Sequence, residues 1–312
     1  MIAAAQDHEL QPAWGLGLDA GGTQTRWALA NRAGVVVAEG AVGGMSALQL
    51  NTTAGVEELR QSLQALGAAV QAPSQGALLG VYAGFTGLGD ACAERALYDL
   101  MVAALPMAPG HVKLTHDMDI ACRAAFAPGQ GYLVYAGTGS IAAFINEEGE
   151  FHRAGGRGPA LGDEGGGYWI AREALAQVWR NEDRQPGAWH TSPMARRIFD
   201  AVGGSDWAFS RQFMYGNDRG AIGKLALQVA ASAHDDEVAR QLLLRAGVEL
   251  AQLAQHLLQR FGPRSVVVGG RAQCLSPLIE QGLRQGLPSD ADLRWVPDLR
   301  AHREAARLAA GV

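Results

Sequence analysis

The alternation of apolar and polar positions along the chain predicts a mixture of short strands and amphipathic helices. The first apolar run, Trp14–Asp19, ends on an acid and is followed by a glycine turn at Gly21 and Gly22. The expected strands of this first part are Trp14–Asp19, Trp27–Ala30, Val35–Ala38, Ala77–Tyr82 and Val112–Thr115, and the expected helices are Thr53–Val70, Asp90 to about Leu105, and a helix that begins at Asp117.

The same order of elements starts again after Pro128-Gly129, which indicates a duplicated unit. Three apolar runs separated by turns precede a helix, as in the first part, and a long amphipathic helix later ends at Gly262-Pro263. The expected strands here are Tyr132–Tyr135, Ile141–Ile145, Phe151 onward, Ser265–Val268 and Leu293–Val296, and the expected helices run from about Tyr168 to Arg180, within Ser192 to about Ala233, from Asp235 to Phe261, after Gly270, and from Arg300 to Ala310.

This repeated order predicts an α/β protein of two domains with a cleft between them. We expect a first domain at 13–118 and a second at 119–299 that carries the inserted helices, with a closing helix at 300–312 that packs back on the first domain. The helix that begins at Asp117 is the expected hinge. Ligands of such folds bind in the crevice at the strand ends, so the functional site is expected there.

Composition narrows the class of protein further. Of the 312 residues, 48% are hydrophobic and 18% are charged, the net charge is −5, and Lys and Arg are scattered along the chain. This balance argues against a nucleic-acid surface, and neither a signal peptide nor a membrane-spanning segment is expected. Cys92, Cys122 and Cys274 lie far apart without metal or redox spacing, so we expect a reducing cytoplasm.

Two glycine turns carry the features that phosphate binding requires. Asp19-Ala-Gly-Gly-Thr23 ends a strand on an acid and then offers bare backbone N–H groups at Gly21 and Gly22, and Gly137-Thr-Gly-Ser140 stands at the equivalent place in the second part. The first turn by itself is explained more simply as an ordinary hairpin turn. Two matched turns at one cleft favour a clamp for a nucleoside triphosphate, which would bring Mg²⁺ with it.

Asp117 follows a strand and begins a helix, and this position leaves two roles open. One is a plain N-cap, because Asp is a preferred residue there. The other is a general base that accepts a proton from an attacking hydroxyl and aligns that hydroxyl on the γ-phosphate. The position by itself does not separate the two.

The tract from Gly155 to Gly167 is unusually rich in glycine and contains Asp163 and Glu164. Because ordering so much glycine costs conformational entropy, we expect its backbone to be needed close to a ligand, with the two carboxylates available to ligand hydroxyls. A flexible loop with solvated acids is the alternative. Gly269-Gly270, after another strand, would let a flat adenine or ribose lie on the backbone.

Together these stretches resemble the N-acetylglucosamine kinases of the sugar kinase/Hsp70/actin superfamily, in the branch shared with activator ATPases (BadF/BadG/BcrA/BcrD type). The resemblance spans nearly the whole chain from Gly15. The stretches that carry it are Asp19-Ala-Gly-Gly-Thr-Gln-Thr-Arg26, Thr115-His-Asp117, Ala136-Gly-Thr-Gly-Ser140, Gly155-Gly-Arg-Gly-Pro-Ala-Leu-Gly-Asp-Glu-Gly165 and Val267-Val-Gly-Gly270.

The resemblance implies two actin-like ATPase (ribonuclease H-like) domains in tandem and an ATP-dependent kinase that uses Mg²⁺ and phosphorylates the 6-hydroxyl of an amino sugar, most simply N-acetylglucosamine. It implies Asp117 as the catalytic base. The implied ATP-binding residues are Asp19, Gly21, Gly22, Thr23, Thr138, Gly223, Gly269 and Gly270, with Asp19 near Mg²⁺. The implied sugar-binding residues are Asp117, Ser140, Gly156, Arg157, Gly158, Asp163 and Glu164. A homodimer is expected.

Two positions depart from the kinase pattern. Arg157 stands where these kinases commonly have Trp, and Gly44-Met-Ser-Ala-Leu48 stands where an Asn often contacts the sugar. The substrate could therefore be glucosamine or, since Arg157 is positive, N-acetylmuramate. The alternative of another class is an activator-type ATPase of an acyl-CoA reductase or dehydratase, which needs cysteines for an iron–sulfur cluster. A sugar-responsive regulator would need a DNA-binding segment.

Overall fold

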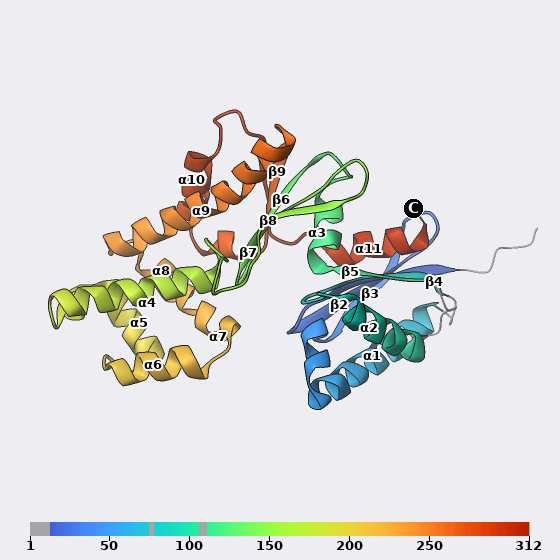
Figure 1. Ribbon diagram of the computed structural model, residues 1–312, viewed down its shortest axis with the longest axis horizontal. Coiled ribbons are helices and arrows are strands. Elements are labelled where there is room, and N and C mark those ends of the chain that lie inside the picture. The colour runs from blue at the N-terminus through green and yellow to red at the C-terminus, as the bar shows by residue number, and fades with distance from the viewer. Residues whose placement is uncertain (1–12, 75–77, 106–110, 312) are drawn as a thin grey trace, which may run out of the picture. The chain divides into compact units, whose positions relative to one another are not determined.

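The structure is a computed structural model that describes residues 13–74, 78–105 and 111–311 (Figure 1). The chain divides into two compact units, which comprise Met1–Ala124 with Arg300–Val312, and Ala125–Leu299, so far as these residues are described. This division lies at the end of α3 (Asp117–Ala125), whereas the sequence places it near the start of that helix. The leader up to Pro12, Ala77 and Val312 lie outside the described residues.

The first unit is built on a five-stranded sheet in the order β3-β2-β1-β4-β5. Its strands are β1 (Trp14–Ala20), β2 (Gln24–Ala30), β3 (Val36–Gly43), β4 (Leu78–Phe85) and β5 (Val112–His116). Its helices are the 3₁₀ helix η1 (Ala47–Asn51), α1 (Thr53–Ser74), α2 (Ala91–Ala104), α3 and α11 (Ala301–Ala310).

Strict alternation along β1 separates the two faces of this sheet. Leu16 and Leu18 are fully buried in the core shared with α1 and α2. Gly15 and Gly17 point to the opposite face, where a Cβ on either residue would overlap the backbone of α11. Because successive side chains of a strand point to opposite faces, leucines bury one side and glycines admit a helix on the other. Figure 1 shows α11 on one side of this sheet and α1 and α2 on the other.

The second unit is built on a five-stranded sheet in the order β10-β9-β6-β7-β8. Its strands are β6 (Gly131–Ala136), β7 (Ser140–Ile145), β8 (Phe151–Gly155), β9 (Ser265–Gly269) and β10 (Leu293–Val296). Its helices are α4 (Gly167–Arg184), η2 (Ala188–Thr191), α5 (Pro193–Val202), α6 (Trp207–Gly216), α7 (Arg219–Gly223), α8 (Leu225–Ser232), α9 (Glu237–Phe261), η3 (Ala272–Leu275) and α10 (Pro277–Gly286). No described helix is long and apolar enough to cross a membrane.

The two sheets have the same connectivity. In the first, β1 pairs antiparallel with β2, β2 pairs antiparallel with β3, and β4 and β5 follow in parallel on the other side of β1. In the second, β6, β7 and β8 form the antiparallel meander and β9 and β10 are the parallel strands. The duplicated α/β architecture expected from the sequence is therefore confirmed.

One glycine lies in a different element from the one its sequence context predicts. The sequence predicts a strand that ends at Tyr82, yet β4 continues to Phe85 and includes Gly84, which pairs with Asp19 of β1 and Thr115 of β5. A Cβ at Gly84 would meet the side chain of Ile120 and the Cα of Asp117, at 2.7 and 3.0 Å. Glycine is thus needed here because α3 begins directly against the strand.

A single buried carboxylate holds two helix N-termini together in the second unit. The carboxylate of Asp236 accepts hydrogen bonds from the hydroxyl of Ser192 (2.7 Å) and the backbone N–H of Met194 (3.0 Å), at the start of α5. It also accepts from the backbone N–H groups of Val238 (3.0 Å) and Ala239 (3.1 Å), at the start of α9. These bonds outweigh the opposing effect of burial and lower the pKa of Asp236.

We expect Asp236→Ala to lower the free energy of unfolding by about 2 kcal/mol, because two helices lose a cap and buried donors are left unsatisfied. Since the folded-state pKa lies below the ordinary 3.8, the stabilisation is complete above about pH 4 and is lost on acidification. Urea denaturation at pH 7 and pH 3 measures both effects. Asp235→Ala is the matched control, because the neighbouring Asp235 is exposed and its carboxylate lies 3.5 Å from His234, away from the two helix N-termini. Equal losses in the two variants would contradict the capping role.

Candidate functional site

The first glycine turn of the chain is held in place by the segment that follows β3. The N–H of Gly21 donates to the carbonyl of Gln24 (3.2 Å), and the N–H of Met45 donates to the carbonyl of Gly21 (3.0 Å). A Cβ on Gly44 would overlap the carbonyl of Gly22, so the two backbones are in direct contact. The turn is therefore a supported feature of the fold and not a loose hairpin end.

Beyond this support, the outer part of the turn is open. Gly22 and Thr23 are exposed, and a Cβ on Gly22 would meet nothing within 4 Å. Asp19, the acid that precedes the turn, is half-buried at the end of β1. The exposed turn leaves room for an anion to approach, with a carboxylate close by along the chain.

Asp117 is the first residue of α3 and follows β5 directly. One carboxylate oxygen accepts from the backbone N–H of Met118 (2.9 Å), which satisfies a helix N-terminal donor. The other accepts a hydrogen bond of 2.6 Å from the hydroxyl of Thr86. The side chain is thus both a helix-terminal acceptor and a carboxylate held in one orientation, as each of the two predicted roles requires.

Thr86 is a site residue that the sequence reasoning missed. Its N–H donates to the carbonyl of Ala20 (3.0 Å), and its carbonyl accepts from the Ser46 hydroxyl and the Ala47 N–H, both at 3.0 Å. Thr86 therefore joins the end of β1, the start of η1 and the carboxylate of Asp117. Its position in the sequence could have indicated this role, because Thr86 directly follows β4. That strand is parallel to β1 and β5, and its carboxyl end adjoins theirs.

A second acid of α3 keeps the helix on the sheet. Asp119 is buried and accepts from the hydroxyl of Tyr82 (2.9 Å) and from Nε of Arg123 (2.8 Å). Burial, together with the neighbouring Asp119 charge, raises the pKa of the Tyr82 hydroxyl, so it stays protonated as the donor. Asp119 consequently anchors the first turn of α3, two residues beyond Asp117.

In the second unit, the corresponding glycine turn receives the N-terminus of α4. The N–H of Gly137 donates to the carbonyl of Gly139 (2.9 Å), which closes the turn. The N–H groups of Gly167 and Tyr168 donate to the carbonyls of Gly137 (2.9 Å) and Thr138 (2.8 Å). The first donors of α4 are therefore satisfied by the turn itself, which fixes the turn against the helix.

Two other expected ATP-binding positions adjoin this turn. A Cβ on Gly223, at the end of α7, would lie 3.4 Å from Cγ2 of Thr138. Gly270 has φ +87° and stands against the carbonyl of Ala136, which leaves no space for a side chain. Gly269 is the last residue of β9, immediately before it. Thr138, Gly223 and Gly270 therefore gather around one turn, although they are far apart in the sequence.

Asp163 is a buried acid of the second unit with an unusual backbone conformation. It is only 3% exposed, and its backbone has φ +64°, a left-handed conformation that is unusual for a residue other than glycine. Burial raises its pKa, while the charge of Arg219 and the backbone N–H groups of Ser140 and Gly158 oppose that shift. Such a buried, strained acid is more typical of a functional position than of a solvated loop.

Arg219, the partner of Asp163, was also missed in the sequence. Its Nη1 lies 2.9 Å from Oδ2 of Asp163, although the two residues belong to separate segments of the unit. No periodic signal marks Arg219, because it begins the short helix α7.

Ser140, another expected sugar-binding residue, forms a hydrogen bond with the same loop. Its hydroxyl donates to the carbonyl of Glu164 (2.6 Å).

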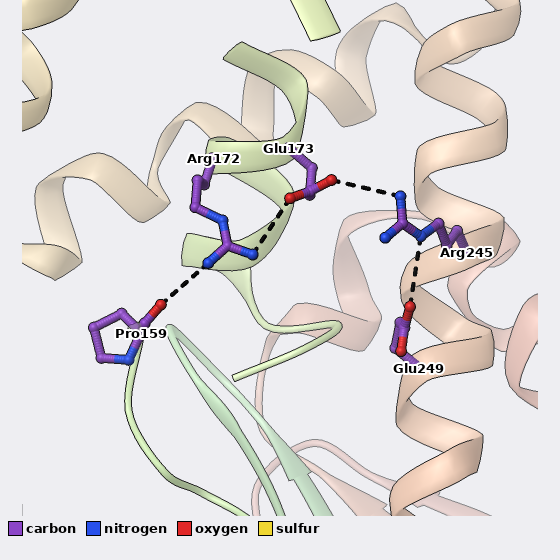
Figure 2. A network of polar contacts seen from close by, with 5 residues as sticks. All are labelled: Pro159, Arg172, Glu173, Arg245 and Glu249. Atoms are coloured by element: carbon purple, nitrogen blue, oxygen red, sulfur yellow. Dashed lines mark hydrogen bonds and ion pairs between the residues drawn. The ribbon is translucent and has the colours of Figure 1, made fainter. Parts of the chain in front are cut away.

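The glycine-rich loop between β8 and α4 is tied to two helices by a chain of polar contacts (Figure 2). Nη1 of Arg172 on α4 donates to the carbonyl of Pro159 (3.1 Å), and Nη2 of the same side chain contacts Glu173 (3.3 Å). Arg245 of α9 then joins Glu173 to Glu249, at 3.5 Å from each. This network anchors the loop at Pro159, next to the expected sugar-binding Gly158.

Gly156 and Gly158 both have positive φ, at +62° and +81°, and Arg157 between them is exposed. A cavity of about 380 Å³ lies on this side of the loop, and Arg157 and Glu164 are among its lining residues. Among residues 13–74, 78–105 and 111–311, no three His, Cys, Asp or Glu side chains cluster closely enough to hold a metal ion.

Comparison with known proteins shows a match to one protein family over most of the chain. A model of the BadF/BadG/BcrA/BcrD ATPase family matches residues 16–285. The N-acetylmuramic acid/N-acetylglucosamine kinase of Clostridium acetobutylicum is 28% identical over 170 residues, 54% of this chain and 55% of that one. The N-acetyl-D-glucosamine kinase of Dictyostelium discoideum is 26% identical over 171 residues, 51% of this chain and 53% of that one. The chain thus spans about half the length of these curated relatives.

A solved structure shares the whole fold. A candidate N-acetylglucosamine kinase from Chromobacterium violaceum superimposes with a TM-score of 0.71, covers 94% of this chain and 98% of its own, and is 24% identical. At that identity the likeness is one of fold.

We expect Gly139→Ala to disturb the second turn, because the new Cβ would lie 2.6 to 2.9 Å from the carboxylate of Asp163. An overpacked buried site of this kind costs about 1–3 kcal/mol, to be measured by urea denaturation. Gly137→Ala is the matched control in the same turn, since its Cβ would lie 3.7 Å from the ring of Tyr135, an ordinary van der Waals distance. A control as unstable as Gly139→Ala would mean that the turn backbone, and not contact with Asp163, sets the cost.

Proposed function

This chain belongs to the BadF/BadG/BcrA/BcrD ATPase family, and from that premise we propose that it is an ATP-dependent kinase that phosphorylates the 6-hydroxyl of an amino sugar, N-acetylglucosamine first among them. The observation that carries the proposal is the hydrogen bond of 2.6 Å between the Thr86 hydroxyl and Asp117. It orients a carboxylate at the carboxyl end of a parallel sheet, where α/β proteins bind their ligands. The names of the curated relatives support the same substrate class.

In the proposed reaction, Asp117 accepts the proton of the sugar hydroxyl while the hydroxyl oxygen attacks the γ-phosphorus of ATP and the bond from that phosphorus to the bridging oxygen of ADP breaks. Asp117 suits this role because Thr86 and the N–H of Met118 each bind one of its oxygens, so the carboxylate does not rotate freely. Each oxygen retains capacity to accept a further hydrogen bond.

The two glycine turns would bind the phosphates of ATP. In the first unit these are Gly21, Gly22 and Thr23, and in the second unit Thr138, with Gly223, Gly269 and Gly270 beside the nucleoside. The open space at Gly22 and the position of Gly223 next to Thr138, where an added Cβ would lie 3.4 Å from Cγ2, support this assignment. Asp19 would hold Mg²⁺ that arrives with ATP, since a carboxylate is a ligand that Mg²⁺ prefers, and the ion would neutralise phosphate charge.

The sugar would be bound by Asp117, Ser140, Asp163 and Glu164 together with the glycine-rich loop at 156–158. The strained backbone and buried carboxylate of Asp163 support its assignment, because a folded chain retains such features where a ligand requires them. The hydroxyl of Ser140 already donates to Glu164, so Ser140 would act as an acceptor or through its backbone. A homodimer and a cytoplasmic location stay predictions.

A second candidate substrate is an acidic amino sugar such as N-acetylmuramate. The exposed guanidinium of Arg157 between two glycines favours it, because Arg binds carboxylates through paired N–H groups.

The function is tested by ADP release with glucosamine, N-acetylglucosamine, N-acetylmannosamine, N-acetylmuramate and glucose, against a reaction without sugar. Sugar-dependent release that is largest with N-acetylglucosamine is expected for the wild-type protein.

Asp117→Asn should lower the rate of sugar-dependent ADP release by about 10²–10⁴-fold while ADP binding changes little, because only the base is removed. Asp99→Asn, an exposed Asp of α2 paired with Arg95, is the control. ADP release that no sugar stimulates would refute the kinase.

Thr86→Val should lower kcat by about ten- to a hundredfold with little change in the KM for sugar, because Asp117 loses the bond that orients it. Thr86→Ser keeps a hydroxyl and should restore most of the rate. Steady-state kinetics of the three proteins measure both parameters. If Ser and Val behave alike, or if only KM changes, Thr86 does not position Asp117.

A further inference from the structure

The cavity beside the glycine-rich loop is walled by three segments of the second unit. The end of β8 contributes Arg153, the loop contributes Arg157 and Glu164, and α9 contributes Glu249, His256 and Arg260. Its volume of about 380 Å³ falls in the range of pockets that hold small molecules. Five of its twelve lining residues are charged, so a polar ligand suits it better than an apolar one.

The three arginines of this cavity outnumber its two carboxylates, those of Glu164 and Glu249. Among the described residues, no carboxylate forms an ion pair with Arg153, Arg157 or Arg260. Glu249 has a partner already, since Arg245 lies 3.5 Å from it. Nη1 of Arg260 donates to the backbone carbonyl of Arg153 (3.0 Å), which ties the Arg260 side chain to the end of β8 and leaves it further donors.

Two acids that are adjacent in the sequence, Asp163 and Glu164, lie on opposite sides of the glycine-rich loop. Glu164 lines the cavity, whereas Asp163 is turned inward to Arg219 and to the N–H groups of Ser140 and Gly158. Arg157 lines the cavity directly before Gly158, which binds Asp163. A ligand that engages Arg157 would therefore act on the backbone that holds Asp163.

We propose that this cavity binds an anionic monosaccharide through Arg153, Arg157 and Arg260, and that its occupancy changes sugar affinity at Asp163 through the loop at 157–163. Guanidinium groups pair with a carboxylate or a phosphate in the same way, so the anion has two possible sources. One is an acidic sugar, and the other is a sugar phosphate of the kind the proposed kinase would form. The coupling, though not the anion binding, rests on the proposed function.

Binding is measured by calorimetry on the full chain without ATP, with N-acetylmuramate, N-acetylglucosamine 6-phosphate and neutral N-acetylglucosamine as probes. We expect Arg153→Gln and Arg260→Gln each to weaken binding of the anionic probe by about tenfold, since each removes a charge-assisted contact. Binding and turnover of the neutral sugar should stay within about twofold. Arg240→Gln on the same helix is the control, because Arg240 pairs with Glu237 and lies outside the cavity.

The pattern of results identifies the source of the anion. Loss of binding confined to N-acetylmuramate assigns the cavity to an acidic sugar, and loss confined to the phosphate assigns it to product. Unchanged affinities in both arginine variants, or inorganic phosphate that binds as tightly as the sugar phosphate, would overturn the proposal. Absent kinase activity would refute only the proposed function, because the binding measurement requires no turnover.

The coupling has its own readout. With the anionic probe present, the affinity for neutral sugar should change by several-fold in the wild-type protein and should not change in Arg260→Gln. An identical response in the two proteins would overturn the coupling.

Discussion

Direct contact of backbone with backbone at the ends of the central strands is the constraint on which the candidate site depends. Gly44 lies against Gly22 in the first unit, and Gly270 lies against Ala136 in the second. A side chain at Gly44 or Gly270 would separate these segments and displace the turns. The turns keep their shape because the protein packs behind them while their outer parts stay open, and this arrangement suits a large anion such as a nucleoside phosphate.

The buried acids of the two units have two different roles, one structural and one in the proposed ligand site. Asp119 and Asp236 are structural, since their oxygens are taken by protein donors that hold helices in place. Asp163 differs, because burial raises its pKa despite Arg219. An acid whose folded-state pKa is raised costs stability when ionised, and this cost falls as the pH drops through that pKa. A protein retains such a loss of stability where the carboxylate is needed to bind a ligand.

The glycine-rich loop connects the proposed sugar site with the arginine-lined cavity. It is anchored at Pro159 by Arg172 and continues into the network on α4 and α9 (Figure 2). Positive φ at Gly156 and Gly158 lets the chain reverse sharply on either side of Arg157. Exposed Arg157 and buried Asp163 therefore belong to one loop, and this is the physical basis of the proposed coupling.

The amino-acid sequence by itself determined the order of strands and helices, the duplication and the glycine turns, because periodicity, glycine and capping residues act locally. It also identified Asp117 and Asp163 as candidates, from their places at a helix start and in a glycine-rich tract. Only the tertiary structure decided the partners of these acids. Thr86 and Arg219 reach Asp117 and Asp163 across long stretches of chain, and such contacts follow from strand order and helix packing, which leave no periodic mark on the sequence.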